Sequence, residues 1–84
     1  LPEWQPPVQG VVPNADTAVR IGTAVLDALG TEAKRELEKF KPWHAELAHG
    51  GAWEVRGTLL GPGGTYVVVI AKRDGRIIAI FHEQ

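Results

Sequence analysis

The second half of the chain shows hydrophobic and polar residues in alternation. Over residues 43–48 and 53–59 an apolar side chain occupies nearly every second position, with charged or polar residues between. Residues 65–71 and 77–81 are apolar on both faces, and Val67, Val68, Val69 and Ile70 are β-branched. Such patterns, separated by glycine-containing turns, are typical of β-strands. We therefore predict four strands over these four ranges.

The turn sequences predict how the strands pair. Asp74-Gly75 is a strong signal for a two-residue hairpin turn between the last two strands. In the first hairpin, a three-residue turn over 49–51 places the apolar residues of both strands on the same face. A two-residue turn would instead pair apolar residues of one strand with polar residues of the other. The linker over 60–64 is too short for a crossover helix, so all neighbouring strands are expected to be antiparallel. The predicted pairs are Leu47–Trp53, Ala45–Val55, Glu46–Glu54 and His44–Arg56 in the first hairpin, and Ala71–Ile78, Val69–Ile80 and Val67–His82 in the last.

The first half of the chain predicts two helices. The main helix spans residues 14–30, with Asn14 as N-cap and Gly30 at its C-terminal end. Gly22 inside this helix costs about 1 kcal/mol relative to alanine, so we expect it to allow a close approach to the sheet. The apolar face is predicted to hold Ala18, Ile21, Val25 and Leu29, with Gly22 and Ala28 beside them.

A shorter second helix is predicted over 31–41. Its acidic residues stand early and its basic residues late, which suits the helix dipole. Thr31 is expected to cap this helix, and Leu37 and Phe40 to anchor it to the core. Pro42 then ends the helix and starts the first strand.

Length and composition limit the classes of function. With 84 residues the chain forms one domain, taken as 14–84, behind an extended lead over 1–13 that carries four of the six prolines. There is no cysteine or serine, which removes thiolate and serine-nucleophile chemistry. The net charge of −1 gives no electrostatic case for nucleic acid or an anionic membrane. No apolar run approaches the roughly 20 residues that span a bilayer.

The start of the chain bears on its compartment. It begins at Leu1 and contains no methionine, so either a signal peptide was removed or the start was trimmed. A cytoplasmic and a periplasmic location, including an exported form, therefore stay open.

The sequence offers little catalytic or metal-binding chemistry. The three histidines, His44, His49 and His82, lack metal-ligand spacing and a flanking carboxylate cluster, so we expect no metal and no cofactor. The predicted first hairpin brings Glu46 and Glu54 together, but on an open sheet with no evident pocket. We therefore predict a protein without catalytic residues.

The sheet face away from the helices is the better candidate for function. One helical layer covers only one side of a sheet, which leaves a half-polar, half-aliphatic surface typical of protein–protein contacts. A homodimer contact, or cover by the proline-rich lead, is the alternative use of this face. The predicted protein-binding residues are His44, Glu46, Glu54, Arg56, Thr58, Val67, Val69, Ile78 and Ile80.

Several sequence blocks together resemble a known family. They include GVVP at 10–13, DTA at 16–18, WEVRGTL at 53–59, and Lys72 with DGRI at 74–77. In combination they resemble the small bacterial immunity proteins of nuclear-transport-factor-two-like (cystatin-like) fold, found beside polymorphic and Rhs-type toxins. The resemblance covers roughly residues 10–82.

The resemblance implies a fold and a function. The expected fold is α+β: an N-terminal helix and a short second helix on one face of a four-stranded antiparallel meander, as a cystatin-like cone. The expected function is binding and neutralising a cognate toxin protein by steric occlusion, without catalysis. An exported binding or inhibitor module of the peptidase-propeptide type, whose ending in D-G-x-I looks similar, is the main alternative. A ligand-binding or enzymatic cone-fold protein is a third, and it requires a deep pocket with converging polar groups.

Overall fold

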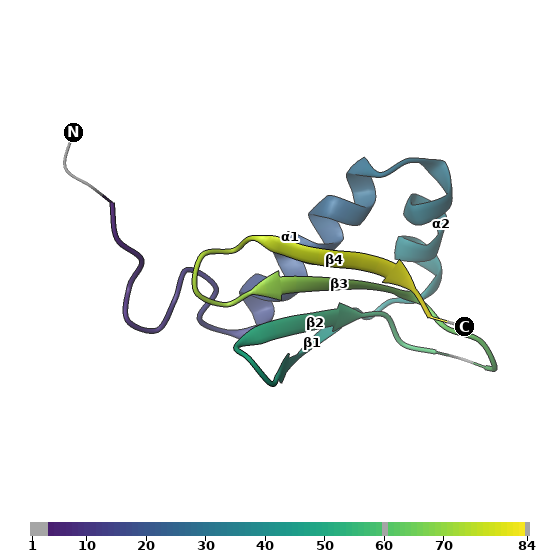
Figure 1. The fold of residues 1–84 in the computed structure, drawn as a ribbon. Coiled ribbons are helices and arrows are strands. Elements are labelled where there is room, and N and C mark those ends of the chain that lie inside the picture. Colours follow the sequence, from purple (N-terminus) through teal and green to yellow (C-terminus); the bar gives the residue numbers. More distant parts are fainter. Residues whose placement is uncertain (1–3, 60, 84) are drawn as a thin grey trace.

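The computed structural model describes residues 4–59 and 61–83 and shows two helices and one sheet (Figure 1). Residues 1–3 of the predicted lead, Leu60 of the predicted linker and Gln84 of the predicted domain lie outside the described residues. The strands form a single antiparallel sheet in the order β1-β2-β3-β4. The predicted α+β meander is thus confirmed. The elements are α1 (Ala15–Ala28), α2 (Thr31–Lys39), β1 (His44–Ala48), β2 (Ala52–Arg56), β3 (Tyr66–Ala71) and β4 (Ile77–His82).

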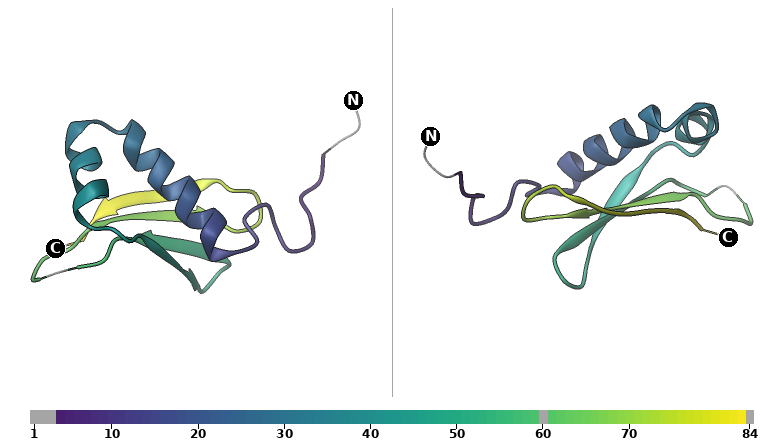
Figure 2. Two further views of the ribbon diagram at one scale, coloured as in Figure 1. Left: turned by 180° about the vertical axis from the view of Figure 1, so that it is seen from behind. Right: turned by 45° about the horizontal axis from the view of Figure 1, so that its top comes forward.

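Both helices lie on the same side of the sheet (Figure 2). α1 packs across β1, β2 and β3, and α2 packs against α1. β4 therefore lies at the edge of the sheet beyond the area that α1 covers. The opposite face of the sheet faces away from both helices, as the sequence predicted.

Asn14 begins α1 as predicted. Its side-chain Oδ1 accepts a hydrogen bond from the backbone N–H of Thr17 at 2.9 Å, which satisfies one of the free amides of the first turn. The predicted buried face is partly wrong. α1 buries Ala18, Gly22 and Leu26, at a spacing of four residues, whereas Leu29 is 53% exposed. Leu29 follows the last turn and is the C-cap, so its side chain no longer points at the sheet.

Gly22 lies where the helix touches the sheet. A Cβ at this position would stand 2.9 Å from Cγ1 and 3.0 Å from Cβ of Val55 on β2, closer than real carbon contacts allow. Val55 itself is fully buried. The predicted close approach is confirmed, and an absent side chain is what permits it.

α2 follows α1 after a sharp bend at Gly30, which is its N-cap; Thr31, the predicted cap, is the first helical residue. Ala33 is buried, and Leu37 and Phe40 pack against the core as predicted. The carbonyl of Leu37 accepts a hydrogen bond from the Trp43 indole N–H at 2.9 Å. This bond fixes the end of α2 to the segment that leads into β1.

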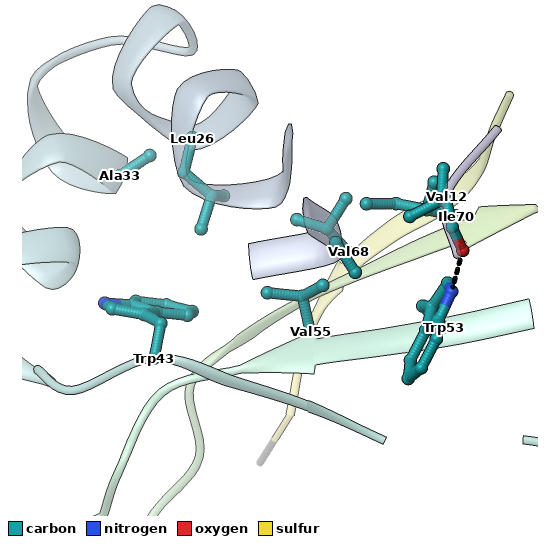
Figure 3. Close-up of a cluster of buried hydrophobic side chains, with 9 residues drawn as sticks. Val12, Leu26, Ala33, Trp43, Trp53, Val55, Val68 and Ile70 are labelled. Atoms are coloured by element: carbon teal, nitrogen blue, oxygen red, sulfur yellow. Dashed lines mark hydrogen bonds between the residues drawn. The ribbon is translucent and has the colours of Figure 1, made fainter. Parts of the chain in front are cut away.

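The core lies between the helices and the sheet (Figure 3). Trp43 and Trp53 lie on either side of Val55 and Val68, which are fully buried. The Trp53 indole N–H donates a hydrogen bond to the carbonyl of Val12 at 2.8 Å. Val12 is also fully buried, so this bond fixes the end of the lead segment to the core.

The backbone of the lead forms hydrogen bonds with the turn between β3 and β4. The N–H groups of Val11 and Val12 donate to the carbonyls of Arg73 and Lys72, both at 3.0 Å. The Lys72 ammonium group also donates to the carbonyl of Gln9. Before Gln9 the lead extends away from the sheet (Figure 1).

The register of the first hairpin is as predicted. Leu47 pairs with Trp53, Ala45 with Val55, and His44 with Arg56. Glu46 faces Glu54, the like-charge pair that the predicted register contains.

The predicted register of the last hairpin is wrong by one residue. Val67 pairs with Phe81 and Val69 with Ala79, and a bulge follows between Val69 and Ile70. A two-residue type I′ turn needs positive φ at both central residues, but only Gly75 has one, +78°. The chain instead makes a wider turn, in which the Gly75 N–H donates to the Ala71 carbonyl and the Ala71 N–H to the Arg76 carbonyl.

Candidate protein-binding surface

The strand registers place six of the nine predicted binding residues together. Paired residues on neighbouring strands point to the same side of a sheet. One row across the strands is His44, Arg56, Val67 and Phe81, and the next is Glu46, Glu54, Val69 and Ala79. We call these eight residues the open face, because they lie on the side away from α1 and α2.

Three predicted binding residues lie elsewhere. Ile80 pairs with Val68, a core residue, and so points to the helix side. Ile78 lies beside the bulge, where β4 departs from strict alternation. Thr58 lies beyond β2, and its hydroxyl donates to the carbonyl of Pro42 at 2.7 Å. The errors at Ile78 and Ile80 follow from the one-residue error in the predicted hairpin register, since such a slip reverses every side chain.

An ion-pair network covers one end of the open face. Arg56 on β2 contacts Glu54 on the same strand and Glu83 just after β4, both at 3.3 Å. The pair with Glu83 crosses β3, which lies between those strands. This crossing accounts for Val67, which is fully buried although it lies on the side without helices. Arg56 therefore has a structural role in this part of the sheet.

The rest of the open face is accessible. Phe81 is 46% exposed, and Val69 and Ala79 are half-buried, so they form an apolar strip over β3 and β4. His44 and Glu46 on β1 are exposed beside it. In the described part of the chain Glu46 makes no ion pair. The surface thus combines an apolar strip with polar side chains at its border, as protein-binding surfaces do with an apolar centre and a polar rim.

His82 pairs with Tyr66, which packs against the core, and so lies on the helix side. The predicted pair with Val67 would place it on the same face as His44, two strands away. The Nε2–H of His82 donates to Glu36 of α2 at 2.8 Å, and its Nδ1–H donates to the Glu83 carbonyl at 2.7 Å. The rings of Tyr66 and His82 form a T-shaped contact, with centroids 4.9 Å apart and planes at 81° to each other. The pKa of His82 is raised above its ordinary value of 6.5, first by the hydrogen bond to Glu36 and also by the bond to Glu83. Both partners are acceptors, so both bonds form only with the protonated ring.

This histidine borders a pocket of about 490 Å³ between α2, the loop before β3 and the end of β4. Catalysis by a histidine–carboxylate pair requires a ring nitrogen free to accept a proton and, for covalent catalysis, a nearby nucleophile. In the protonated ring both nitrogens of His82 are engaged, and none of the described residues that line the pocket carries a hydroxyl or thiol group. The pair is better explained as a tie between β4 and α2. The lining residues are Glu36, Lys39, Phe40, Gly63, Gly64, His82 and Glu83.

A second pocket, of about 400 Å³, lies between the lead and the turns at Gly50-Gly51 and Lys72-Arg73. The described residues that line it are prolines, glycines, Val8, Gln9 and two basic residues, and none of them is an acid or a histidine. Across residues 4–59 and 61–83, no three histidine, aspartate or glutamate side chains gather closely enough to hold a metal ion. His44 and His49 are both exposed and separate.

Sequence reasoning missed two features of this region. Phe81 and Ala79 replace Ile80 and Ile78 on the open face because of the bulge. The contact between Glu36 and His82 joins residues 46 positions apart. No periodicity or motif signals either feature.

The fold and this surface define a class of protein. The chain is a small α+β domain of nuclear-transport-factor-two-like type, with helices on one side of an antiparallel meander and an uncovered face on the other. A family model described as NTF2 fold immunity protein matches residues 17–84, and the chain belongs to this family. The resemblance seen in the sequence is thereby confirmed. Neither a curated protein nor a solved structure matches the chain significantly.

Family membership supports an immunity role and suggests that the chain acts by binding rather than by catalysis. It also implies a toxin as partner. Neither helix, within the residues described, has the length and apolar character needed to cross a membrane.

Proposed function

We propose that this chain neutralises a cognate bacterial toxin from a polymorphic toxin system by binding it through the open face and blocking it sterically. The observation that carries the proposal is the match to the immunity family over residues 17–84. The open face supports it, because this side of the sheet has no helical cover and presents apolar and charged side chains together.

The chemistry of the open face suggests what the toxin presents. Interfaces concentrate binding energy in a few central apolar or aromatic side chains within a polar rim. Phe81 and Val69 would supply the centre, and Glu46 lies at the rim on β1. We therefore expect the toxin to place an apolar side chain on the strip and a lysine or arginine opposite Glu46. With a net charge of −1, the chain relies on these short-range contacts more than on long-range steering.

The test is inhibition of the toxin encoded beside the chain, measured with purified proteins at increasing ratios. Steric occlusion predicts that one chain inhibits one toxin and that toxin released from the complex is active and chemically unchanged. Inhibition at substoichiometric ratios, or a covalent change in the toxin, would show an enzymatic mechanism instead.

The binding face is tested with two substitutions that leave β4 untouched, Val69→Glu and Glu46→Lys. Loss of one central contact typically costs about 2 kcal/mol, so we expect roughly 30-fold weaker binding for Val69→Glu. Leu29→Glu and Glu32→Lys are matched controls, because Leu29 is exposed at the C-cap of α1 and Glu32 is exposed on α2. If both open-face variants fold and bind as tightly as these controls, the toxin binds elsewhere.

A further inference from the structure

β4 is an edge strand that is open on three sides. Within residues 4–59 and 61–83 no strand pairs with its outer edge, and both of its faces carry exposed side chains, with His82 contacting Glu36 of α2 on the helix side. Ile78 is 50% exposed near one end and Phe81 46% near the other, and Ile77 and Ile80 are also exposed. Monomeric proteins rarely leave a long apolar edge uncovered, because its free backbone groups pair with other chains.

The hydrogen-bond pattern shows which backbone groups are free. The Glu83 N–H donates to the Thr65 carbonyl at 2.9 Å, so this pair is a hydrogen-bonded pair of the β3–β4 ladder. In an antiparallel ladder such pairs alternate with non-bonded ones. The backbone groups of Phe81 and Ala79 therefore point to β3, and those of Ile80 and His82 point to the free edge.

The other edge of the sheet is protected in the usual ways, and β4 is not. β1 has five residues and carries His44 and Glu46, and charged side chains discourage pairing with another strand. β4 has six residues, with no proline and no Asp, Glu, Lys or Arg. Its bulge lies at the first residues only, so the stretch from Ala79 to His82 is regular.

β4 is flanked by one positive and one negative side chain, of which Glu83 also contacts Arg56 of its own chain at 3.3 Å. Arg76 precedes the strand and Glu83 follows it, with only apolar residues and His82 between them. An antiparallel second copy sets the Arg76 end of each strand beside the Glu83 end of the other. A parallel copy would set like charges together, which is unfavourable.

We propose that two copies of this chain associate through antiparallel pairing of their β4 edges about a two-fold axis at Ile80. In this register the outward backbone groups of Ile80 form hydrogen bonds with those of Ile80 in the second copy. The outward groups of His82 face Ile78 of the second copy. An axis perpendicular to the sheet keeps both open faces on one side. The product is an eight-stranded sheet with two open faces side by side. This dimer does not depend on whether the open face binds a toxin.

The test is the mass of the full chain in solution, by sedimentation equilibrium over a range of concentrations. We expect about twice the chain mass of 9.1 kDa. Ile80→Pro removes one outward N–H and leaves the β3 ladder intact, so this variant is expected to be folded and monomeric. Ile80→Ala is the matched control: it shortens the same side chain but keeps the N–H, and it should dimerise at least tenfold more tightly than the proline variant.

A second variant keeps the test decisive if Ile80→Pro does not fold. Arg76→Glu changes an exposed turn residue, and it sets like charges together at both ends of the paired strands. We expect it to weaken the dimer about tenfold. A wild-type chain that is monomeric at all concentrations, or a dimer unaffected by both substitutions, overturns the proposal. A monomer whose toxin binding is lost in Ile80→Pro would instead assign the β4 edge to the toxin.

Discussion

The contact between Gly22 and Val55 provides the sharpest test of how the helices lie on the sheet. Gly22→Ala adds one methyl group to the buried face of α1. In an exposed helix this change stabilises by about 1 kcal/mol, because alanine is the better helix former. Here the new Cβ would lie 2.9 Å from Cγ1 of Val55, so the two effects oppose each other.

The structure indicates which effect is larger. Overpacking a well-packed core costs about 1–3 kcal/mol. Val55 is fully buried and β-branched, so it has no alternative rotamer into which it can withdraw easily. We therefore expect a net destabilisation of about 1 kcal/mol, which lowers the Tm of a domain of this size by roughly 4–8 °C.

The assay is chemical and thermal unfolding of four variants. Gly22→Ala and Val55→Ala each destabilise, and the double variant should recover about 1 kcal/mol relative to their sum, because the smaller side chain makes room for the new methyl group. Ala24→Gly is the control for helix propensity, since Ala24 is an exposed residue of the same helix. If Gly22→Ala alone stabilises the protein, the contact between Gly22 and Val55 is not as close as 2.9 Å.

Two further predictions concern single hydrogen bonds. Trp53→Phe leaves the buried Val12 carbonyl without its donor and should lower the free energy of unfolding by about 1–3 kcal/mol in urea titrations; an unchanged midpoint would mean that the bond does not hold the lead. The raised pKa of His82 stabilises the fold fully below pH 6.5, and this contribution is lost as the pH rises through the higher folded-state pKa. Glu36→Gln should lower the pKa of His82, measured by NMR titration, toward 6.5, and the Tm should then decrease less as the pH rises above 6.5. If the pKa of His82 is the same in this variant as in the wild type, the pairing with Glu36 is contradicted.

The sequence predicted the first hairpin better than the last for a physical reason. In the first hairpin only one register keeps Trp53 and Val55 on the same side as Ala45, so the hydrophobic pattern decides. β3 and β4 are apolar on both faces, so their pattern tolerates a slip. The register then depends on the turn, where Asp74 does not adopt the positive φ that the prediction required.

The candidate surface was predictable as a face but not in every residue. The strict alternation of β1 and β2 was enough to assign His44, Glu46 and Glu54 to the side away from the helices. The structural role of Arg56 could not be foreseen, because its partner Glu83 belongs to a segment two strands away. The same limit applies to Glu36 and His82, whose contact depends on where α2 ends relative to the sheet edge.

The exposed residues of β4 have an energetic consequence. Fully burying a side chain such as isoleucine or phenylalanine is worth about 1.5–3 kcal/mol. Four such side chains in β4 are each 36–50% exposed, so the isolated chain forgoes about 3–5 kcal/mol. Domains are typically stable by only about 5–15 kcal/mol, so this loss is large for an 84-residue chain. A partner that covers β4 recovers it, and the Tm of the chain should therefore rise with the concentration of whichever partner occupies that edge.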